Sequence, residues 1–146
     1  MRANHFSITV SDLDRSLTFY RDLLGLPVKQ IGEVDAPYIG KIVGVEGTKI
    51  RLAELDLQEG LLLELFEYSS PIGEPVRPRT WDPGSTHIAF DVDDIDAIWE
   101  RLRAAGVETK SPEPILIDDP RWYGARCAYI SDPDGVTIEI SEGPRE

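Results

Sequence analysis

Two histidines and two glutamates occupy matching places in this sequence. The chain has only two histidines, His5 and His87, and each opens a strand-like run. Glu64 and Glu139 each lie in a later strand-like run. Two imidazoles and two carboxylates form a donor set that suits a divalent ion such as Zn, Ni, Co, Mn or Fe. These four residues are therefore a candidate metal site, provided that the fold brings them together.

An internal repeat relates the two halves of this set. Positions 5 and 87 differ by 82, and positions 64 and 139 differ by 75. The first offset also places Asp12 on Asp94, and the second places Arg51 on Arg126. A short motif with metal-ligand spacing is absent, so the repeat is what makes the four-residue set specific.

Each copy of the repeat is typical of a strand, a helix and then about three strands. We predict one domain over 1–146, built from module 1 at about 1–68 and module 2 at about 86–142. Residues 69–85 hold four prolines and two glycines and are predicted to connect the modules. One helix covers only one face of a sheet, so we expect an α+β fold in which the modules share a core. The expected architecture is paired βαβββ modules that form a curved, mostly antiparallel sheet with the helices on its outer face.

Apolar periodicity indicates where the main elements lie. Ser11 is the candidate N-cap of the first helix. Residues 34–49 read as a loop with at most one helical turn. The predicted helices and strands are helices at 11–25 and 93–106, a hairpin of strands at 50–57 and 61–68 that turns near Gln58, Glu59 and Gly60, and a second hairpin around the "DPDG" turn at 132–135.

Strand alternation predicts the faces of the candidate ligands. Phe6, Ile8 and Val10 are expected to pack on the helix, which leaves His5 on the opposite face. By the same parity His87 and Glu139 face away from the helix. Glu64 has apolar neighbours, and a glutamate in such surroundings is unfavourable unless it is paired or ligated.

Composition restricts the classes of partner. The net charge of −12 argues against nucleic acid and anionic membranes, which need clustered positive charge. No run approaches the roughly 18 apolar residues of a membrane span, and the N-terminus lacks the apolar core of a signal peptide. Cys127 is the single cysteine and cannot form an internal disulfide. We expect a cytoplasmic protein that acts on a small molecule.

Three segments carry a family resemblance. They are "HFSITVSDLDRSLTFYRDLLGL" (5–26), "THIAFDVDDIDAIWERLRAAGV" (86–107) and "YISDPDGVTIEISE" (129–142). They resemble the vicinal oxygen chelate superfamily, which includes glyoxalase I, methylmalonyl-CoA epimerase, extradiol dioxygenases, and fosfomycin and bleomycin resistance proteins. The resemblance implies paired βαβββ modules, a homodimer and one divalent metal ion per site. It also implies that His5, Glu64, His87 and Glu139 fall on the family's four ligand positions, a set that looks most like bacterial glyoxalase I.

The resemblance leaves several reactions open. The favoured one is proton transfer at a carbon next to a carbonyl through a metal-bound enolate, of the glyoxalase I or acyl-CoA epimerase kind. In that reaction Glu139 or Glu64 acts as general base and acid. The alternatives are an extradiol Fe(II) dioxygenase, which would use the two histidines and Glu139, and a drug-binding resistance protein. The dioxygenase reading leaves Glu64 as an extra negative group at the metal.

Four further residues are candidates for substrate binding. Arg51 and Arg126 are repeat-equivalent and are expected to reach the cavity, where a cation would bind a substrate carboxylate. Trp122 and Tyr123, in the loop at 118–126, are a candidate aromatic wall for the substrate.

Overall fold

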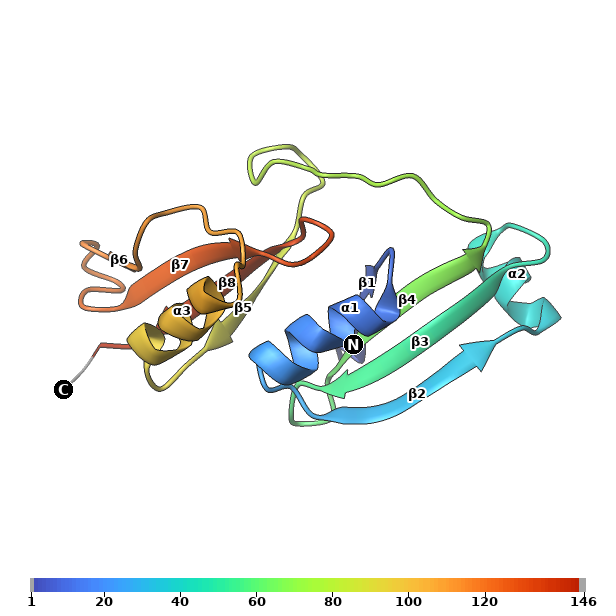
Figure 1. Ribbon diagram of the computed structural model, residues 1–146, viewed down its shortest axis with the longest axis horizontal. Coiled ribbons are helices and arrows are strands. Elements are labelled where there is room, and N and C mark those ends of the chain that lie inside the picture. Colours follow the sequence, from blue (N-terminus) through green and yellow to red (C-terminus); the bar gives the residue numbers. More distant parts are fainter. Residues whose placement is uncertain (1, 145–146) are drawn as a thin grey trace. The chain divides into compact units, whose positions relative to one another are not determined.

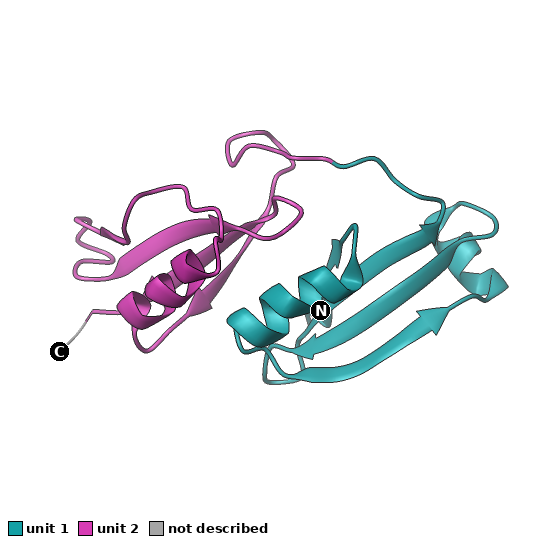
Figure 2. Cartoon of the chain, in the orientation of Figure 1, with its two compact units in different colours: residues 1–75 teal, residues 76–146 magenta. Residues whose placement is uncertain are grey.

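The chain divides into two compact units. The computed structural model describes residues 2–144, and the units are Met1–Pro75 and Val76–Glu146 (Figure 2). Module 1 lies within the first unit and module 2 within the second. Each unit contains a βαβββ succession, as the repeat predicted, and each has a four-stranded mixed sheet of its own.

Unit 1 is a sheet in the order β1-β4-β3-β2 with a helix against one face. Strands β1 and β4 run parallel, and the other neighbouring strands are antiparallel. Helix α1 continues into a π-helix, η1, and α1 contacts β3 and β4 (Figure 1). The elements are β1 (His5–Thr9), α1 (Leu13–Leu17), η1 (Thr18–Leu23), β2 (Val28–Val34), α2 (Pro37–Val43), β3 (Lys49–Asp56) and β4 (Leu62–Ser70).

Unit 2 repeats this plan in shorter form. Its sheet has the order β5-β8-β7-β6, with β5 and β8 parallel and the remaining pairs antiparallel. Helix α3 contacts β8. The elements are β5 (His87–Asp91), α3 (Ile95–Ala104), β6 (Ile115–Leu116), β7 (Arg126–Ser131) and β8 (Thr137–Glu142).

The repeat extends to the way the helices begin. Asp12 caps α1 by accepting from the Arg15 amide, and Asp94 caps α3 by accepting from the Ala97 amide. The predicted cap, Ser11, was therefore wrong by one position. Aspartate is as good an N-cap as serine, and here it is Asp12 that has the extended backbone which a cap requires.

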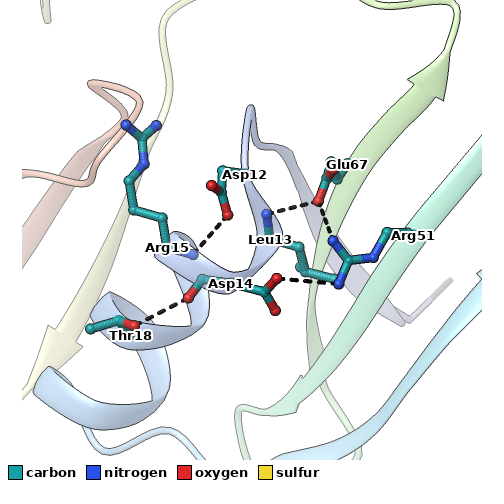
Figure 3. Close-up of polar contacts among 7 residues, drawn as sticks. All are labelled: Asp12, Leu13, Asp14, Arg15, Thr18, Arg51 and Glu67. Atoms are coloured by element: carbon teal, nitrogen blue, oxygen red, sulfur yellow. Dashed lines mark hydrogen bonds and ion pairs between the residues drawn. The ribbon is translucent and has the colours of Figure 1, made fainter.

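A carboxylate from the last strand binds the first amide of each helix. Glu67 in β4 accepts from the Leu13 amide at 2.9 Å, and Glu142 in β8 accepts from the Ile95 amide at 3.0 Å. Figure 3 shows the contact in unit 1. Four amides at a helix N-terminus lack partners inside the helix, and an anion there is favourable. These carboxylates fix each helix to its own sheet.

Apolar residues of each helix are buried against the sheet of the same unit. In unit 1 these are Leu13, Leu17 and Tyr20, which are buried together with strand residues such as Leu63 and Leu65, whereas Leu24 is half-buried. In unit 2 the buried helix residues are Ile95, Ile98, Trp99 and Leu102.

Two local predictions in module 1 were wrong. Residues 34–49 contain α2, a helix of seven residues, rather than a loop with at most one turn. Pro37 stands at its start and Gly44 ends it in the left-handed conformation (φ 81°), both favourable helix boundaries. Phe6 is 50% exposed instead of packing on the helix, whereas Ile8 and Val10 are buried as predicted. Phe6 lies near the start of β1, an edge strand of its sheet.

The turn predicted for the first hairpin is confirmed. The first hairpin turns at Gln58, Glu59 and Gly60, all of which have positive φ. Between Ser70 and His87 the structure has neither a helix nor a strand. Within residues 2–144 there is no helix of the length and apolar character that crossing a membrane requires.

Candidate metal and proton-transfer site

Module 1 places His5 beside Glu64. Ser7 in β1 is in register with Glu64 in β4, and His5 lies two residues earlier on the same face. The His5 Nε2 atom is 3.5 Å from Glu64 Oε2. Glu64 is mostly buried, with 14% of its side chain exposed, whereas 44% of the His5 side chain is exposed. The imidazole is therefore accessible while the carboxylate is held within the sheet.

A neighbouring amide orients the His5 ring. The Nδ1 atom donates to Asn4 Oδ1 at 2.8 Å. The Nε2 atom of the same ring faces the Glu64 carboxylate. A hydrogen bond to the other ring nitrogen is the usual way in which a ligating histidine is oriented. Two electron-rich groups at this distance suit a cation held between them.

Module 2 places His87 beside Glu139 in the same manner. Ala89 in β5 is in register with Glu139 in β8, and His87 lies two residues before Ala89. The His87 Nε2 atom is 3.3 Å from Glu139 Oε2, and the two side chains are 45% and 21% exposed. The Tyr129 ring lies 5.3 Å from the His87 ring, between centroids, and Tyr129 is the cross-strand neighbour of Glu139.

Burial and like charge shift the acid–base properties of these groups. Desolvation raises the pKa of Glu64, His5 lowers it by a smaller amount, and the nearby Glu54 carboxylate raises it further. Burial and the Glu139 carboxylate together raise the pKa of Tyr129 and that of Cys127. Both groups therefore stay protonated near neutral pH, and Cys127 behaves as an unreactive thiol.

The structure brings the four predicted ligands together as two pairs. His5 meets Glu64 in unit 1, and His87 meets Glu139 in unit 2. Across residues 2–144, no group of three or more His, Cys, Asp and Glu side chains is arranged to hold a metal ion. The four-ligand site stays a prediction, supported by two pairs of matching chemistry and position.

Arg51 and Arg126 lie on the helix side of their sheets. Arg51 is in register with Glu67 and is 3.1 Å from its carboxylate, and it also contacts Asp14 in α1 at 3.4 Å (Figure 3). Its repeat partner Arg126 pairs with Asp96 in α3 at 2.7 Å. These contacts support each helix against its own sheet, on the face opposite the candidate ligands.

The aromatic candidates are exposed and lie outside the strands. Trp122 is 63% exposed and Tyr123 is 68% exposed, in the loop before β7. A cavity of about 570 Å³ lies elsewhere in unit 1, lined by residues between Asp35 and Thr48, and contains none of the predicted site residues.

Sequence reasoning missed Glu54. It lies directly across from Glu64 in the β3–β4 pair, on the same face. The offset of 75 that relates Glu64 to Glu139 also relates Glu54 to Tyr129, which lies directly across from Glu139. The repeat therefore contained a signal for both positions, but using it needed the register of the hairpins.

Comparison with known proteins agrees with this fold and with these elements. The family model described as "Glyoxalase/Bleomycin resistance protein/Dioxygenase superfamily" matches residues 2–140. A 2-epi-5-epi-valiolone epimerase from an Actinomyces species is 32% identical over 97% of this chain and 79% of its own length. A lactoylglutathione lyase from Haemophilus influenzae is 31% identical, over 97% of this chain and 93% of its own.

A solved structure has the same fold. The crystal structure of a glyoxalase family protein from Bacillus cereus matches with a TM-score of 0.85 at 23% identity, and the match covers 99% of this chain and 95% of the other. The family match over nearly the whole chain and the two curated relatives lead to one conclusion: the chain belongs to the glyoxalase/bleomycin resistance protein/dioxygenase superfamily.

Proposed function

We propose that this protein is a divalent-metal-dependent enzyme that transfers a proton at a carbon next to a carbonyl group. The observation that carries the proposal is the pair of His–Glu contacts at repeat-equivalent positions, His5 with Glu64 and His87 with Glu139. The names of the two curated relatives, an epimerase and a lactoylglutathione lyase, support an isomerase or lyase activity of this kind.

The donor set fits one divalent ion. His5 and His87 would supply neutral imidazole nitrogens, and Glu64 and Glu139 would supply carboxylate oxygens, a combination that suits Ni, Co, Zn, Mn or Fe. Each pair alone offers only two ligands. The proposal therefore requires the two pairs to meet, within one chain or between two copies of it, and a homodimer is part of the proposal.

The bound ion would act as a Lewis acid that polarises the substrate carbonyl and so acidifies the neighbouring carbon–hydrogen bond. The chain itself supplies the proton carriers. Glu139 or Glu64 takes the proton from one face of the substrate carbon, and either the same or the other carboxylate returns it.

Metal stoichiometry tests the ligand set. The purified protein is stripped with chelator, titrated with Ni, Co, Zn, Mn and Fe(II), and analysed for metal content by mass spectrometry. We expect one ion per chain. His5→Ala and His87→Ala should each weaken binding by at least tenfold, because each removes a ligand from the same site. Two independent ions per chain, or no affinity for any of the five, would contradict the shared site.

Exchange of the substrate proton with solvent tests the reaction. The metal-loaded protein is incubated in D₂O with hemithioacetals, acyl-CoA thioesters and simple hydroxy ketones, and deuterium at the carbon next to the carbonyl is followed by NMR. Exchange should disappear when Glu64 and Glu139 are both replaced by Gln. Consumption of a catechol and O₂ by the Fe(II)-loaded protein, without any such exchange, would favour the dioxygenase alternative instead.

A further inference from the structure

A row of polar side chains crosses the sheet of unit 1 at the level of Glu64. Strand register places Ser7, Glu64, Glu54 and Gln30 next to one another on β1, β4, β3 and β2. Residues directly opposite each other in neighbouring strands share a face. The row therefore extends from the candidate ligand Glu64 across the whole sheet, on the face away from α1.

The Glu54–Glu64 contact is unfavourable for folding. Like charges directly opposite in a strand pair are destabilising, and the Glu54 carboxylate contributes to the raised pKa of Glu64. The repeat shows that the fold does not need an acid here, because Tyr129 occupies the matching position in module 2. A carboxylate that destabilises the sheet and is not required by the fold is a candidate for function.

The lysine and arginine side chains of the strands each contact a carboxylate other than Glu54 and Glu64. Within residues 2–144, the strands carry four cationic side chains, each of which contacts a carboxylate: Lys29 with Asp56, Lys49 with Asp35, Arg51 with Glu67, and Arg126 with Asp96. Arg51, the one nearest Glu54 in sequence, lies on the opposite face of the sheet. Glu54 therefore places a second carboxylate beside the candidate ligand Glu64.

We propose that Glu54 is a specificity-determining residue that, with Gln30, binds the hydroxyl groups of an uncharged carbonyl substrate and repels anionic ones. The carboxylate accepts hydrogen bonds from hydroxyl groups, and the exposed Gln30 amide both donates and accepts. Substrates that carry phosphate or carboxylate groups meet a like charge at the same place, which is selection by repulsion. This inference rests on the proposed proton transfer and narrows its substrate class.

Two compounds that differ in one phosphate group test the proposal. Dihydroxyacetone is an uncharged hydroxy ketone, and dihydroxyacetone phosphate is its anionic counterpart. Proton exchange in D₂O is measured by NMR for both with the full-length, metal-loaded protein, and binding of each is measured separately by calorimetry. We expect a kcat/KM at least about tenfold higher for the uncharged compound, since a charge–charge distance of roughly 8 Å in a partly hydrated site corresponds to about fivefold or more per unit charge.

The variant E54Q removes the charge and keeps the shape. It should reduce the preference for the uncharged compound by about tenfold, since the whole preference is attributed to this charge, and it should fold at least as well as wild type, because it relieves repulsion with Glu64. The control E33Q makes the same charge change in the same sheet on the opposite face, where Glu33 is in register with Arg51. In E33Q the preference for the uncharged compound should stay within about twofold of the wild-type preference, which is the scale of a surface substitution.

The outcomes separate this inference from the proposed function. If proton exchange occurs and E54Q prefers the uncharged compound as strongly as wild type does, the role of Glu54 is overturned and the proposed proton transfer stands. Absence of exchange, with binding that still favours the uncharged compound and depends on Glu54, would overturn the proposed reaction and support the specificity. Absence of both exchange and binding would overturn the two together.

Discussion

The contact between Glu142 and the start of α3 should stabilise unit 2 strongly. Glu142 is 5% exposed, and its carboxylate accepts from the Ile95 amide at 3.0 Å. A hydrogen bond to a charged group contributes about 1.5–3 kcal/mol, and an anion at a helix N-terminus adds about 0.3–1 kcal/mol. Glu142→Ala should therefore lower the free energy of unfolding by about 2–4 kcal/mol. Glu142→Gln keeps an acceptor oxygen and should lose about half as much.

Urea denaturation measures this effect. Unfolding is followed by far-ultraviolet circular dichroism and by the fluorescence of Trp99, which is buried in α3. The matched control is Glu100→Gln, which removes an exposed charge from the middle of the same helix and should change stability by less than about 0.5 kcal/mol. A loss below about 0.5 kcal/mol for Glu142→Ala would refute the assigned role of this carboxylate.

Three further predictions concern stability. Burial and Glu54 raise the pKa of Glu64, so the carboxyl group of Glu64 binds a proton more tightly in the native state than in the unfolded chain. The resulting stabilisation is present below the ordinary pKa of 4.5 and is lost as the pH rises through the pKa of Glu64 in the native state. The free energy of unfolding of metal-free Glu64→Gln should therefore exceed that of wild type by about 1 kcal/mol at pH 7 and by less at pH 4. Denaturation in the presence of chelator measures this difference, and a difference that does not depend on pH would contradict the reasoning. Trp99→Ala should lower the free energy of unfolding by about 3–5 kcal/mol, measured by circular dichroism because the variant lacks this fluorophore; Trp99 is only 5% exposed, and a loss under about 1 kcal/mol would contradict its role in the core. Gly40→Ala should be destabilising by more than about 1 kcal/mol, since its Cβ would lie 2.8 Å from the Val45 carbonyl oxygen; Gly32→Ala, whose Cβ meets nothing within 4 Å, is the control.

Much of the fold was predictable because it depends on local pattern. The βαβββ succession in each module, the buried stripe of α3 and the turn at Gln58–Gly60 follow from apolar periodicity and turn chemistry, and all three are present. The helix α2 was missed because its sequence, with glycine inside and no buried residue, lacks an amphipathic pattern.

The candidate site was predictable in part, for a different reason. Parity and the repeat placed His5, Glu64, His87 and Glu139 at matching positions as one predicted set, and the structure shows the contacts of His5 with Glu64 and of His87 with Glu139. The same rules gave no information about partners across strands. Arg51 was expected near the substrate, and only the register with Glu67 and the position of Asp14 show that it faces the helix.

The sequence alone determined the family, the repeat and the residue types at the four matching positions, because residue identity and strand alternation are local properties of the chain. Tertiary structure decided which carboxylates face one another. Glu54 is ten positions from Glu64 in the chain but directly opposite it in the sheet, since the turn at Gln58–Gly60 sets the register of β3 against β4. A one-residue slip of that register would move Glu54 to the other face. The charge beside the candidate metal ligand is thus a product of the fold.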